Sequence, residues 1–367
     1  MRASAILILV VSILVLFGLV MLVSTSAPQG ERLFGNPYHF IQRHLAWLVL
    51  GLIVAALAAR VDYHAWFKLA WPMFGVTLVL LALVYVPGIG LNIKGSHRWL
   101  RLPLGLSFQP SELAKFTAIN VLAFWFGTKR RQRGGFKDGI LIPSVLLGAM
   151  LGLILFETDF GATILIGAVG GLVMFAGGAP WLYLVAGGLL GMGGLGVMIA
   201  HNPERMGRIL AFLHPEKYAQ DEAFQLMHAL YAFVAGGAGG LGLGESLQKK
   251  HYLPEAHTDF IFAIIGEELG IAASLGVVLL FVALLLCGLR ISGRAPDAGG
   301  RLMAFGITVL ISLQAAINIG VVTGRLPTKG LPLPFISFGG TSLMVTLFMV
   351  GVLLNIARQS ARVHRRK

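Results

Sequence analysis

The residues best placed to do chemistry lie in His251–Gly270, which reads HYLPEAHTDFIFAIIGEELG. This stretch ends a polar segment of about sixty residues and runs into a long apolar segment. Asp259 stands where the two meet, and an ionisable side chain at the edge of an apolar helix is a functional candidate by default. A carboxylate in that place can take a proton from a reacting hydroxyl group. Asp259 is therefore our first candidate for a catalytic residue.

Three further carboxylates share this stretch. If the helix begins at Pro254, Glu255 and Asp259 lie on one face at i, i+4. Glu267 and Glu268 then lie about 12 to 13 Å deeper and on different faces. We expect at least one of them to point among neighbouring helices, protonated or hydrogen-bonded. The alternative for both is a purely structural role as buried carboxyls.

A second polar stretch, LNIKGSHRWLRLPLGLSFQPSELAK (91–115), supplies positive charge. Pro110 predicts the start of a helix, because proline is tolerated in the first turn, and Ser111 is its expected cap. Glu112 and Lys115 would then be neighbours at i, i+3. They form either part of a functional site or a structural ion pair at a helix end.

The stretch ETDFGA at 157–162 carries two more acidic side chains, Glu157 and Asp159. Its composition predicts a tight turn between two apolar segments. We expect both carboxylates to be solvated there.

The segment 324–338 contains three prolines, which forbid a regular helix. Irregular backbone at membrane depth is tolerated only where protein buries it or where it lines a wet cavity. Ser337, Thr341 and the backbone of Gly339–Gly340 are therefore expected either to line a cavity or to form a structural re-entrant plug.

The composition defines the class of protein that must position these residues. Hydrophobic residues make up 56% of the 367 residues and charged residues 12%, against roughly 25% charged in a soluble domain. Cys287 is the only cysteine, so a disulfide within the chain is excluded. We expect one integral membrane domain over 1–367, all-α, with ten transmembrane helices. The apolar runs are roughly 5–23, 45–59, 69–87, 113–127, 139–155, 161–179, 181–200, 260–290, 302–323 and 339–357.

The charges orient these spans. With both termini in the cytoplasm, the inner segments hold sixteen basic residues against three aspartates, so the whole net charge of +13 lies inside. This basic face suits anionic lipid rather than nucleic acid. The outer segments are then about 24–44, 88–112, 201–259 and 324–338. The third is a large external loop between the seventh and eighth spans, and its residues 222–237 predict an amphipathic helix.

The chain also resembles a known family. The motifs GLGESLQKKHYLPEAHTDFIFAIIGEELG, KGSHRWL…FQPSELAK and LPTKGLPLPFISFGGTS look like those of the SEDS family (shape, elongation, division and sporulation proteins). Its members FtsW and RodA are bacterial peptidoglycan glycosyltransferases with ten spans. The motifs LPEAHTDFIFAIIGEELG and LPTKG favour the FtsW branch, whereas FQPSE and LPLPFIS also resemble RodA. Where relatives tend to read QPDLGT, this chain has ETDFGAT at 157–163.

The resemblance implies a reaction, the polymerisation of lipid II into glycan strands on the outer face of the bacterial cytoplasmic (inner) membrane. Asp259 matches the essential aspartate of the family and would take the proton of the acceptor hydroxyl or activate a metal-bound acceptor. A divalent cation, Mg²⁺ or Mn²⁺, is compatible with that carboxylate. The candidates for binding substrate or pyrophosphate are Arg98, Glu112, Lys115, Arg205, Arg208, Lys249, Glu255, His257, Ser337 and Thr341.

Two alternatives remain open. A lipid II flippase would use Glu267 and Glu268 as gates or proton carriers, and a non-catalytic scaffold would only dock a transpeptidase. The resemblance implies a class B penicillin-binding protein as partner, with its single transmembrane helix near the eighth and ninth spans. Other divisome or elongasome membrane proteins are further expected partners.

Overall fold

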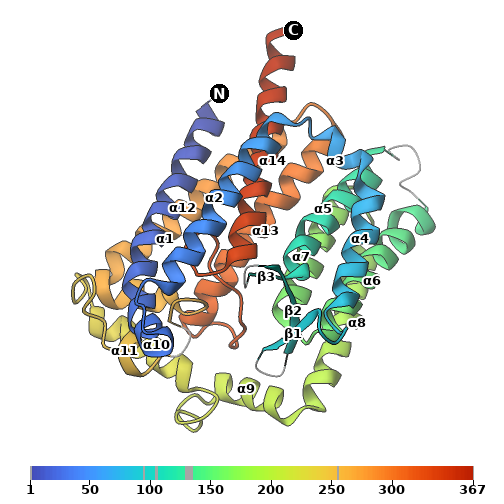
Figure 1. Cartoon of the computed structure of the whole chain (residues 1–367). Helices are drawn as coiled ribbons and strands as arrows, with labels where there is room; N and C mark the ends of the chain where they lie inside the picture. Colours follow the sequence, from blue (N-terminus) through green and yellow to red (C-terminus); the bar gives the residue numbers. More distant parts are fainter. Residues whose placement is uncertain (1, 94–95, 104–105, 129–134, 254–255, 367) are drawn as a thin grey trace.

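The long helices of the chain run side by side between two ends (Figure 1). The computed structural model describes residues 2–93, 96–103, 106–128, 135–253 and 256–366. Both termini lie at one end, called the terminal end below, and α9 to α11 lie at the opposite, loop end. The ten apolar runs correspond to α1 (Arg2–Phe34), α2 (His39–Arg60), α4 (Ala70–Leu83), α5 (Pro110–Thr128), α6 (Ile142–Phe156), α7 (Phe160–Ala176), α8 (Trp181–Ala200), α12 (Ile261–Gly293), α13 (Ala298–Val322) and α14 (Gly340–Arg366).

Shorter elements connect the helices. The terminal end carries α3 (His64–Lys68) and a π-helical turn (Lys137–Leu141). The loop end carries α9 (Pro203–Leu213), α10 (Phe224–Gly236), α11 (Gln248–His251) and a sheet of β1 (Gly90–Ile93), β2 (Ser96–Arg101) and β3 (Ser107–Phe108). The sheet is antiparallel in the order β1-β2-β3, with Leu91 opposite Trp99 and Leu100 opposite Phe108. The all-helical prediction missed this small sheet, because its strands are too short to show a clear alternation.

The fold is that of a multi-span membrane protein, as predicted. Among the described residues, seven helices are long and apolar enough to cross a membrane, namely α1, α2, α6 with its preceding turn, α8, α12, α13 and α14. The apolar helices α4 and α7 are shorter. The count of ten spans stays a prediction.

The helix α5 occupies the interior of the bundle. It packs against α4, α7 and α13, and its buried residues include the polar side chains of Lys115, Thr117 and Asn120. Each has a partner: Thr117 shares a hydrogen bond of 2.9 Å with Thr77, and Asn120 Nδ2 donates to the carbonyl of Trp66 at 2.8 Å. Satisfied hydrogen bonds make this polar burial tolerable.

The helix α8 is the opposite case. None of its residues is buried, and its main contacts are with its sequence neighbours α7 and α9. Leu190 is 79% exposed and Met192 70%. An apolar surface of this extent is suited to contact with lipid or with another protein.

The first predicted span is too short. α1 continues to Phe34, so only residues 35–38 separate it from α2 and the expected outer segment 24–44 is mostly helical. The polar residues at 24–26 suggested an end, but they are accommodated inside the bundle. Thr25 Oγ1 donates to the carbonyl of Met21 at 2.8 Å, and Ser24 Oγ donates to Glu268 at 2.7 Å.

The helix α12 begins later than predicted and is broken. It starts at Ile261, so Asp259 precedes the helix and does not lie within it. At Gly270 the backbone has φ +76°, a left-handed conformation that favours glycine. The carbonyls of Glu267 and Glu268 accept hydrogen bonds from the N–H groups of Leu241 and Gly242, each at 2.9 Å. The glycine-rich segment at 236–244, interpreted as a flexible turn, instead packs against the break.

The predicted helix at 222–237 exists as α10, but it packs with a different face. Leu226, Ala229 and Ala232 are buried against the bundle, whereas Tyr231 is 50% and Val234 80% exposed. The small side chains let α10 approach α12 closely.

The segment between α13 and α14 is irregular and inserted among the helices, as its prolines predicted. Leu331, Leu333, Phe335 and Ile336 are buried. The backbone at Phe335–Ile336 lies so close to α1 that a Cβ on Gly18 would come within 2.6 Å of a carbonyl oxygen. The segment therefore acts as a structural plug.

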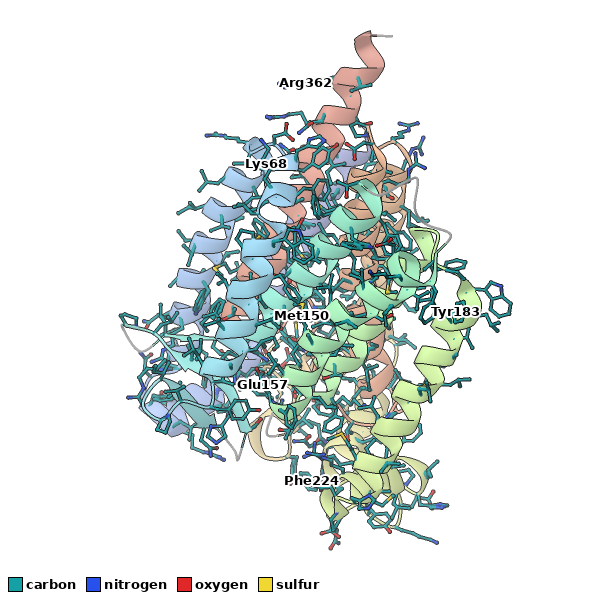
Figure 2. All side chains as sticks on the ribbon, turned by 90° about the vertical axis from the view of Figure 1, so that its right-hand side faces the viewer. Lys68, Met150, Glu157, Tyr183, Phe224 and Arg362 are labelled. Carbon is teal, nitrogen blue, oxygen red and sulfur yellow. The ribbon has the colours of Figure 1, made fainter. Side chains whose placement is uncertain are left out.

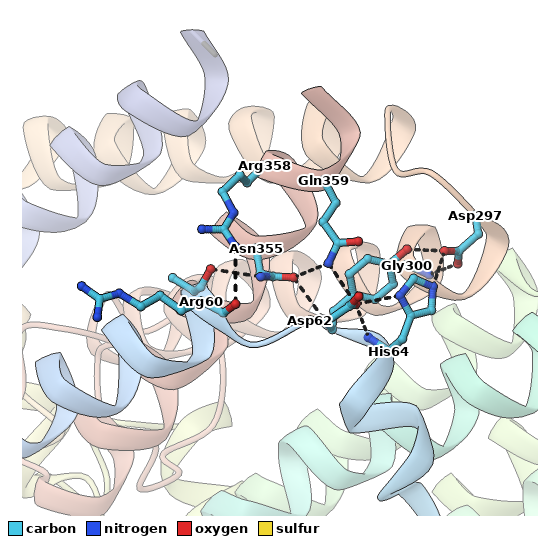
Figure 3. Close-up of polar contacts among 10 residues, drawn as sticks. Arg60, Asp62, His64, Asp297, Gly300, Asn355, Arg358 and Gln359 are labelled. Atoms are coloured by element: carbon cyan, nitrogen blue, oxygen red, sulfur yellow. Dashed lines mark hydrogen bonds and ion pairs between the residues drawn. The ribbon is translucent and has the colours of Figure 1, made fainter. Parts of the chain in front are cut away.

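A polar cluster at the terminal end links three parts of the chain (Figure 3). These are the connection between α2 and α3, the connection between α12 and α13, and the helix α14. Tyr63 donates to Asp297, and the ring of His64 lies between Asp62, at 2.7 Å, and Asp297, at 3.0 Å. Gln359 of α14 donates to Asp62 at 2.9 Å. Burial alone would raise the pKa of Asp62, but the hydrogen bonds from Gln359 and His64 lower it to about 2.

Candidate functional site

Asp259 lies at the loop end, half-buried, directly before α12. A Cβ placed on Gly330 would be 2.8 Å from Asp259 Oδ2, so the carboxylate lies against the Gly330 backbone. Asn318 of α13 stabilises this contact. Its Nδ2 donates to the carbonyl of Asp259 and to that of Leu331, both at 2.7 Å. One amide side chain thus holds together two loops that are distant in the sequence.

The neighbour of Gly330 is Lys329, a cation that the sequence interpretation missed. Burial lowers the pKa of Lys329, while the charge of Asp159 opposes that effect. Within the described residues its ammonium makes no hydrogen bond or ion pair. A half-buried lysine of this kind, beside a carboxylate, is available to an anionic ligand. The motif LPTKG was the signal in the sequence that could have identified it.

Glu112 and Lys115 form a buried ion pair in the first two turns of α5. Lys115 Nζ lies 2.7 Å from Glu112 Oε1 and donates to Gln314 Oε1 at 2.9 Å. Gln314 in turn donates to the carbonyl of Pro332 at 2.8 Å. The pair therefore supports the backbone of the Lys329–Pro332 segment. The prediction that Pro110 starts the helix is confirmed, but Ser111 lies inside the first turn and is no cap.

The other basic candidates are engaged by protein groups. Arg98 donates to the carbonyls of Glu157 and Thr158, at 3.3 and 2.7 Å. Arg205 lies 4.4 Å from the ring centre of Phe160 in a cation–π contact. Arg208 also has a partner.

Lys249, Glu267 and Glu268 form a buried network at the break of α12. Lys249 Nζ lies 2.5 Å from Glu268 Oε1 and donates to Ser24 Oγ at 2.8 Å. Glu267 accepts hydrogen bonds from the hydroxyl of Ser246 and from the N–H of Leu247, the latter at 3.0 Å. Both glutamates are fully buried and hydrogen-bonded, as expected for at least one. Because both carboxylates are bonded to protein groups that hold the break of α12, we interpret their role as structural.

The prediction of a solvated turn at 157–162 is wrong. Glu157 is 1% exposed and Asp159 4%. Asp159 caps α7, because its Oδ1 accepts from the N–H of Ala162 at 3.0 Å and its Oδ2 from Gln109 Nε2 at 3.3 Å. Neither carboxyl oxygen of Glu157 has a hydrogen-bond partner among the described residues. Figure 2 shows Glu157 towards the loop end, opposite Lys68 and Arg362.

The pKa of Glu157 is raised to about 9 by burial and by the charge of Asp159, against which Arg98 acts weakly. Between its unfolded pKa and about 9, the folded protein holds a proton that the unfolded chain has lost. Stability should therefore fall as the pH rises through this window. Glu157→Gln, which imitates the protonated carboxyl, should unfold at the same temperature as wild type at pH 5 and at a higher one at pH 8.

This is measured by thermal unfolding in detergent at the two pH values. Glu216→Gln, at an exposed position, is the matched control. Parallel pH dependences for Glu157→Gln and wild type would mean that Glu157 is ionised in the folded protein.

Of the remaining predicted residues, His257 lines a cavity at the loop end. Its volume is about 240 Å³, and it is lined by Arg43, Trp47, Trp99, Leu106, Ser107, His257, Thr258, Phe338, Gly339 and Gly340. Ser337 and Thr341 do not line it. Ser337 Oγ donates to the carbonyl of Thr258 at 2.6 Å, and Thr341 Oγ1 to that of Ser107 at 3.3 Å. Glu255 lies outside the described residues.

No cluster of three or more metal-ligating side chains occurs in the part of the chain that the structure describes. A single carboxylate plus phosphate oxygens is nevertheless a common way of binding Mg²⁺. Among the described residues, Asp259 offers a carboxylate of this kind.

Together these features define an integral membrane protein with a carboxylate and a half-buried lysine at one end of its helix bundle. The chain belongs to the cell cycle protein family of FtsW, RodA and SpoVE, whose model matches residues 4–362. The resemblance seen in the sequence is thereby confirmed.

Named relatives agree. The chain is 41% identical over 352 residues to a probable peptidoglycan glycosyltransferase FtsW of Trichlorobacter lovleyi, covering 96% of this chain and 92% of that one. It is 42% identical over 356 residues to the protein of the same name from Geobacter sulfurreducens, covering 97% and 95%. These names favour the FtsW branch, as LPTKG did.

Solved structures show the same fold. A chain of a peptidoglycan synthase complex that coordinates polymerization and crosslinking has a TM-score of 0.80 and 29% identity, covering 96% of this chain and 97% of that one. The rod shape determining protein RodA of Thermus thermophilus has a TM-score of 0.72 and 28% identity, covering 96% of both chains.

Proposed function

We propose that this chain is a peptidoglycan glycosyltransferase that polymerises lipid II, with Asp259 as general base. The observation that carries the proposal is the carboxylate of Asp259 against Gly330, which follows the half-buried Lys329 in the chain. Its relatives are named peptidoglycan glycosyltransferases, which is the activity of this chain too. The reaction class needs a base for the acceptor and a cation for the leaving group, and this site offers one of each.

In the reaction, the acceptor hydroxyl attacks the anomeric carbon of the donor. Its proton passes to the Asp259 carboxylate as the new C–O bond forms. The bond from the anomeric carbon to pyrophosphate breaks, and undecaprenyl pyrophosphate leaves with the electron pair. The ammonium of Lys329 stabilises the negative charge that develops on the leaving oxygen, most effectively where water is partly excluded.

A divalent cation suits this site, with Asp259 as one ligand and the substrate's pyrophosphate as the others. Such an ion would add positive charge next to the leaving group. The protein's own contribution remains the positions of Asp259 and Lys329, which Asn318 and Gln314 fix.

We place the loop end outside the cytoplasmic (inner) membrane. Arg60, Lys68, Arg290 and Arg362 all belong to the terminal end, which supports a cytoplasmic position for that end. A class B penicillin-binding protein is the proposed partner, since a related structure is a peptidoglycan synthase complex. The exposed apolar face of α12, at Leu275, Leu279 and Leu286, supports docking of a transmembrane helix there.

The flippase alternative loses its main support. It needs Glu267 and Glu268 as mobile gates, yet both are fully buried and occupied by Ser246, Lys249 and backbone N–H groups. A pure scaffold would not need a free lysine beside a carboxylate.

The test is polymer formation from lipid II by purified protein in liposomes, with a class B partner and a divalent cation. Lys329→Met should lower kcat about 10²–10³-fold, the usual cost of losing a group that stabilises a developing anion. Lys329→Arg should restore part of the activity. Lys217→Met, at an exposed position, is the control. No polymer from wild type would contradict the function, and full activity of Lys329→Met would remove Lys329 from it.

A further inference from the structure

The cavity at the loop end, called the aromatic cavity below, has no role in the mechanism described so far. Five parts of the chain build it: α2, β2, the start of β3, the residues before α12, and the start of α14. Trp47, Trp99 and Phe338 give it three aromatic walls. Ser107 and the backbone of Gly339–Gly340 add polar groups to the lining.

The walls of the aromatic cavity are fixed before any ligand arrives. A Cβ on Gly340 would be 2.3 Å from both Cδ1 and Nε1 of Trp47, so the indole lies directly on that glycine. The N–H of Phe338 donates to the carbonyl of His257 at 2.9 Å, and the two rings lie 5.7 Å apart. Trp99 is held in the sheet opposite Leu91. A preformed site of this kind costs little to order on binding.

The charge at the cavity is positive. Arg43 is exposed, and its guanidinium makes no hydrogen bond or ion pair within the described residues. The 27-residue helix α14 begins at Gly340, which lines the cavity. The first N–H groups of a helix have no carbonyl acceptor within the helix, and they point out of its N-terminal end. A guanidinium matches the geometry of phosphate oxygens. Arg43 lies near the start of α2, at its loop end.

The size and lining select a sugar. Pockets for whole drug-sized ligands hold about 300–1,000 Å³, so 240 Å³ suits one sugar ring better than a complete headgroup. Aromatic side chains present an apolar face and also tolerate polar edges. A saccharide ring, which has apolar faces and hydroxyl edges, matches such walls.

We propose that the aromatic cavity binds the pyrophosphate-linked sugar of the acceptor substrate, with Arg43 on its pyrophosphate. This assignment rests on the proposed function and specifies where one of its two substrates binds. Thr258 lines the cavity and is followed directly by Asp259, so the second sugar of the acceptor extends towards the base. The donor loses its pyrophosphate beside Lys329, which does not line the cavity.

The experiment separates the two substrates. A preformed lipid-linked oligomer is supplied as donor at a fixed concentration, and lipid II is titrated as acceptor. Arg43→Ala and Trp99→Ala should each raise the KM for lipid II about tenfold, with kcat and the KM for the oligomer within a factor of two of wild type. Arg32→Ala, exposed on the same end at the close of α1, should leave all constants unchanged.

Direct binding tests the cavity independently of turnover. Asp259→Asn protein is titrated with radiolabelled lipid II, alone and combined with Arg43→Ala or Trp99→Phe. Weaker binding in both combinations, with unchanged thermal unfolding, supports the acceptor site. Unchanged binding, or a KM effect on the oligomer alone, overturns it. If wild type binds lipid II at the cavity but makes no polymer, the proposed function fails and the binding site stands.

Discussion

Asp259→Asn protein should fold, bind its partner and make no measurable glycan polymer from lipid II. The substitution is nearly isosteric, so the contact with Gly330 and the hydrogen bond from Asn318 to the backbone carbonyl are retained. What is lost is the group that takes the acceptor proton. General base catalysis contributes typically 10²–10⁴-fold, and we expect a loss of kcat in that range or larger. Product is measured on gels of glycan strands in liposomes.

Asp221→Asn is the matched control, because Asp221 is an exposed aspartate of the same end. It should polymerise as wild type does. Equal polymer from Asp259→Asn and wild type would take Asp259 out of the chemistry. An inactive Asp259→Asn protein that also unfolds at a much lower temperature would show a structural role instead.

Lys249→Met should destabilise the protein by about 3–5 kcal/mol, the usual cost of leaving a buried charge without its partner. Lys249 and Glu268 are 9% and 0% exposed, and Ser24 is their only further side-chain partner among the described residues. Without the ammonium, the carboxylate of Glu268 must take up a proton or remain uncompensated. The expected result is a clear fall in the unfolding temperature in detergent.

The double variant Lys249→Met/Glu268→Met should recover much of this loss, because apolar groups of similar size can replace a buried ion pair at little cost. Lys217→Met, at an exposed position, should leave the unfolding temperature unchanged. If Lys249→Met unfolds like wild type, the buried pair contributes nothing and the α12 break is held by its backbone hydrogen bonds alone.

The sequence predicted the helices well because each one is an apolar run with a recognisable length. It also predicted the pairing of Glu112 with Lys115, which depends on local spacing. It placed Asp259 at the edge of a long apolar helix, but inside that helix, whereas α12 begins two residues later. Lys329 was missed because the contact between its neighbour Gly330 and Asp259 is a tertiary one. Asn318 holds the two loops together by donating to a carbonyl of each, and these loops are distant in the sequence. No local pattern encodes such a contact.

The errors have similar physical causes. Glu157 was expected to be exposed to solvent, because charged side chains usually are exposed. In the folded protein, tertiary packing leaves its side chain almost fully buried. Polar residues 24–26 suggested a helix end, although their hydrogen bonds lie inside the bundle. The break of α12 needed both Gly270 and the distant segment 237–242, and only the glycine was visible in the sequence.

The break at Gly270 has a mechanical consequence for the site. Hydrophobic mismatch tilts a long membrane helix as the bilayer becomes thinner or thicker. In α12, however, the segment 237–242 bonds to both sides of the break, to Glu267 and Glu268 before it and to Ile271 after it. We expect this clamp to keep the two parts of α12 at a fixed angle when the helix tilts. The residues just before α12, Asp259 among them, should then move together with the whole helix.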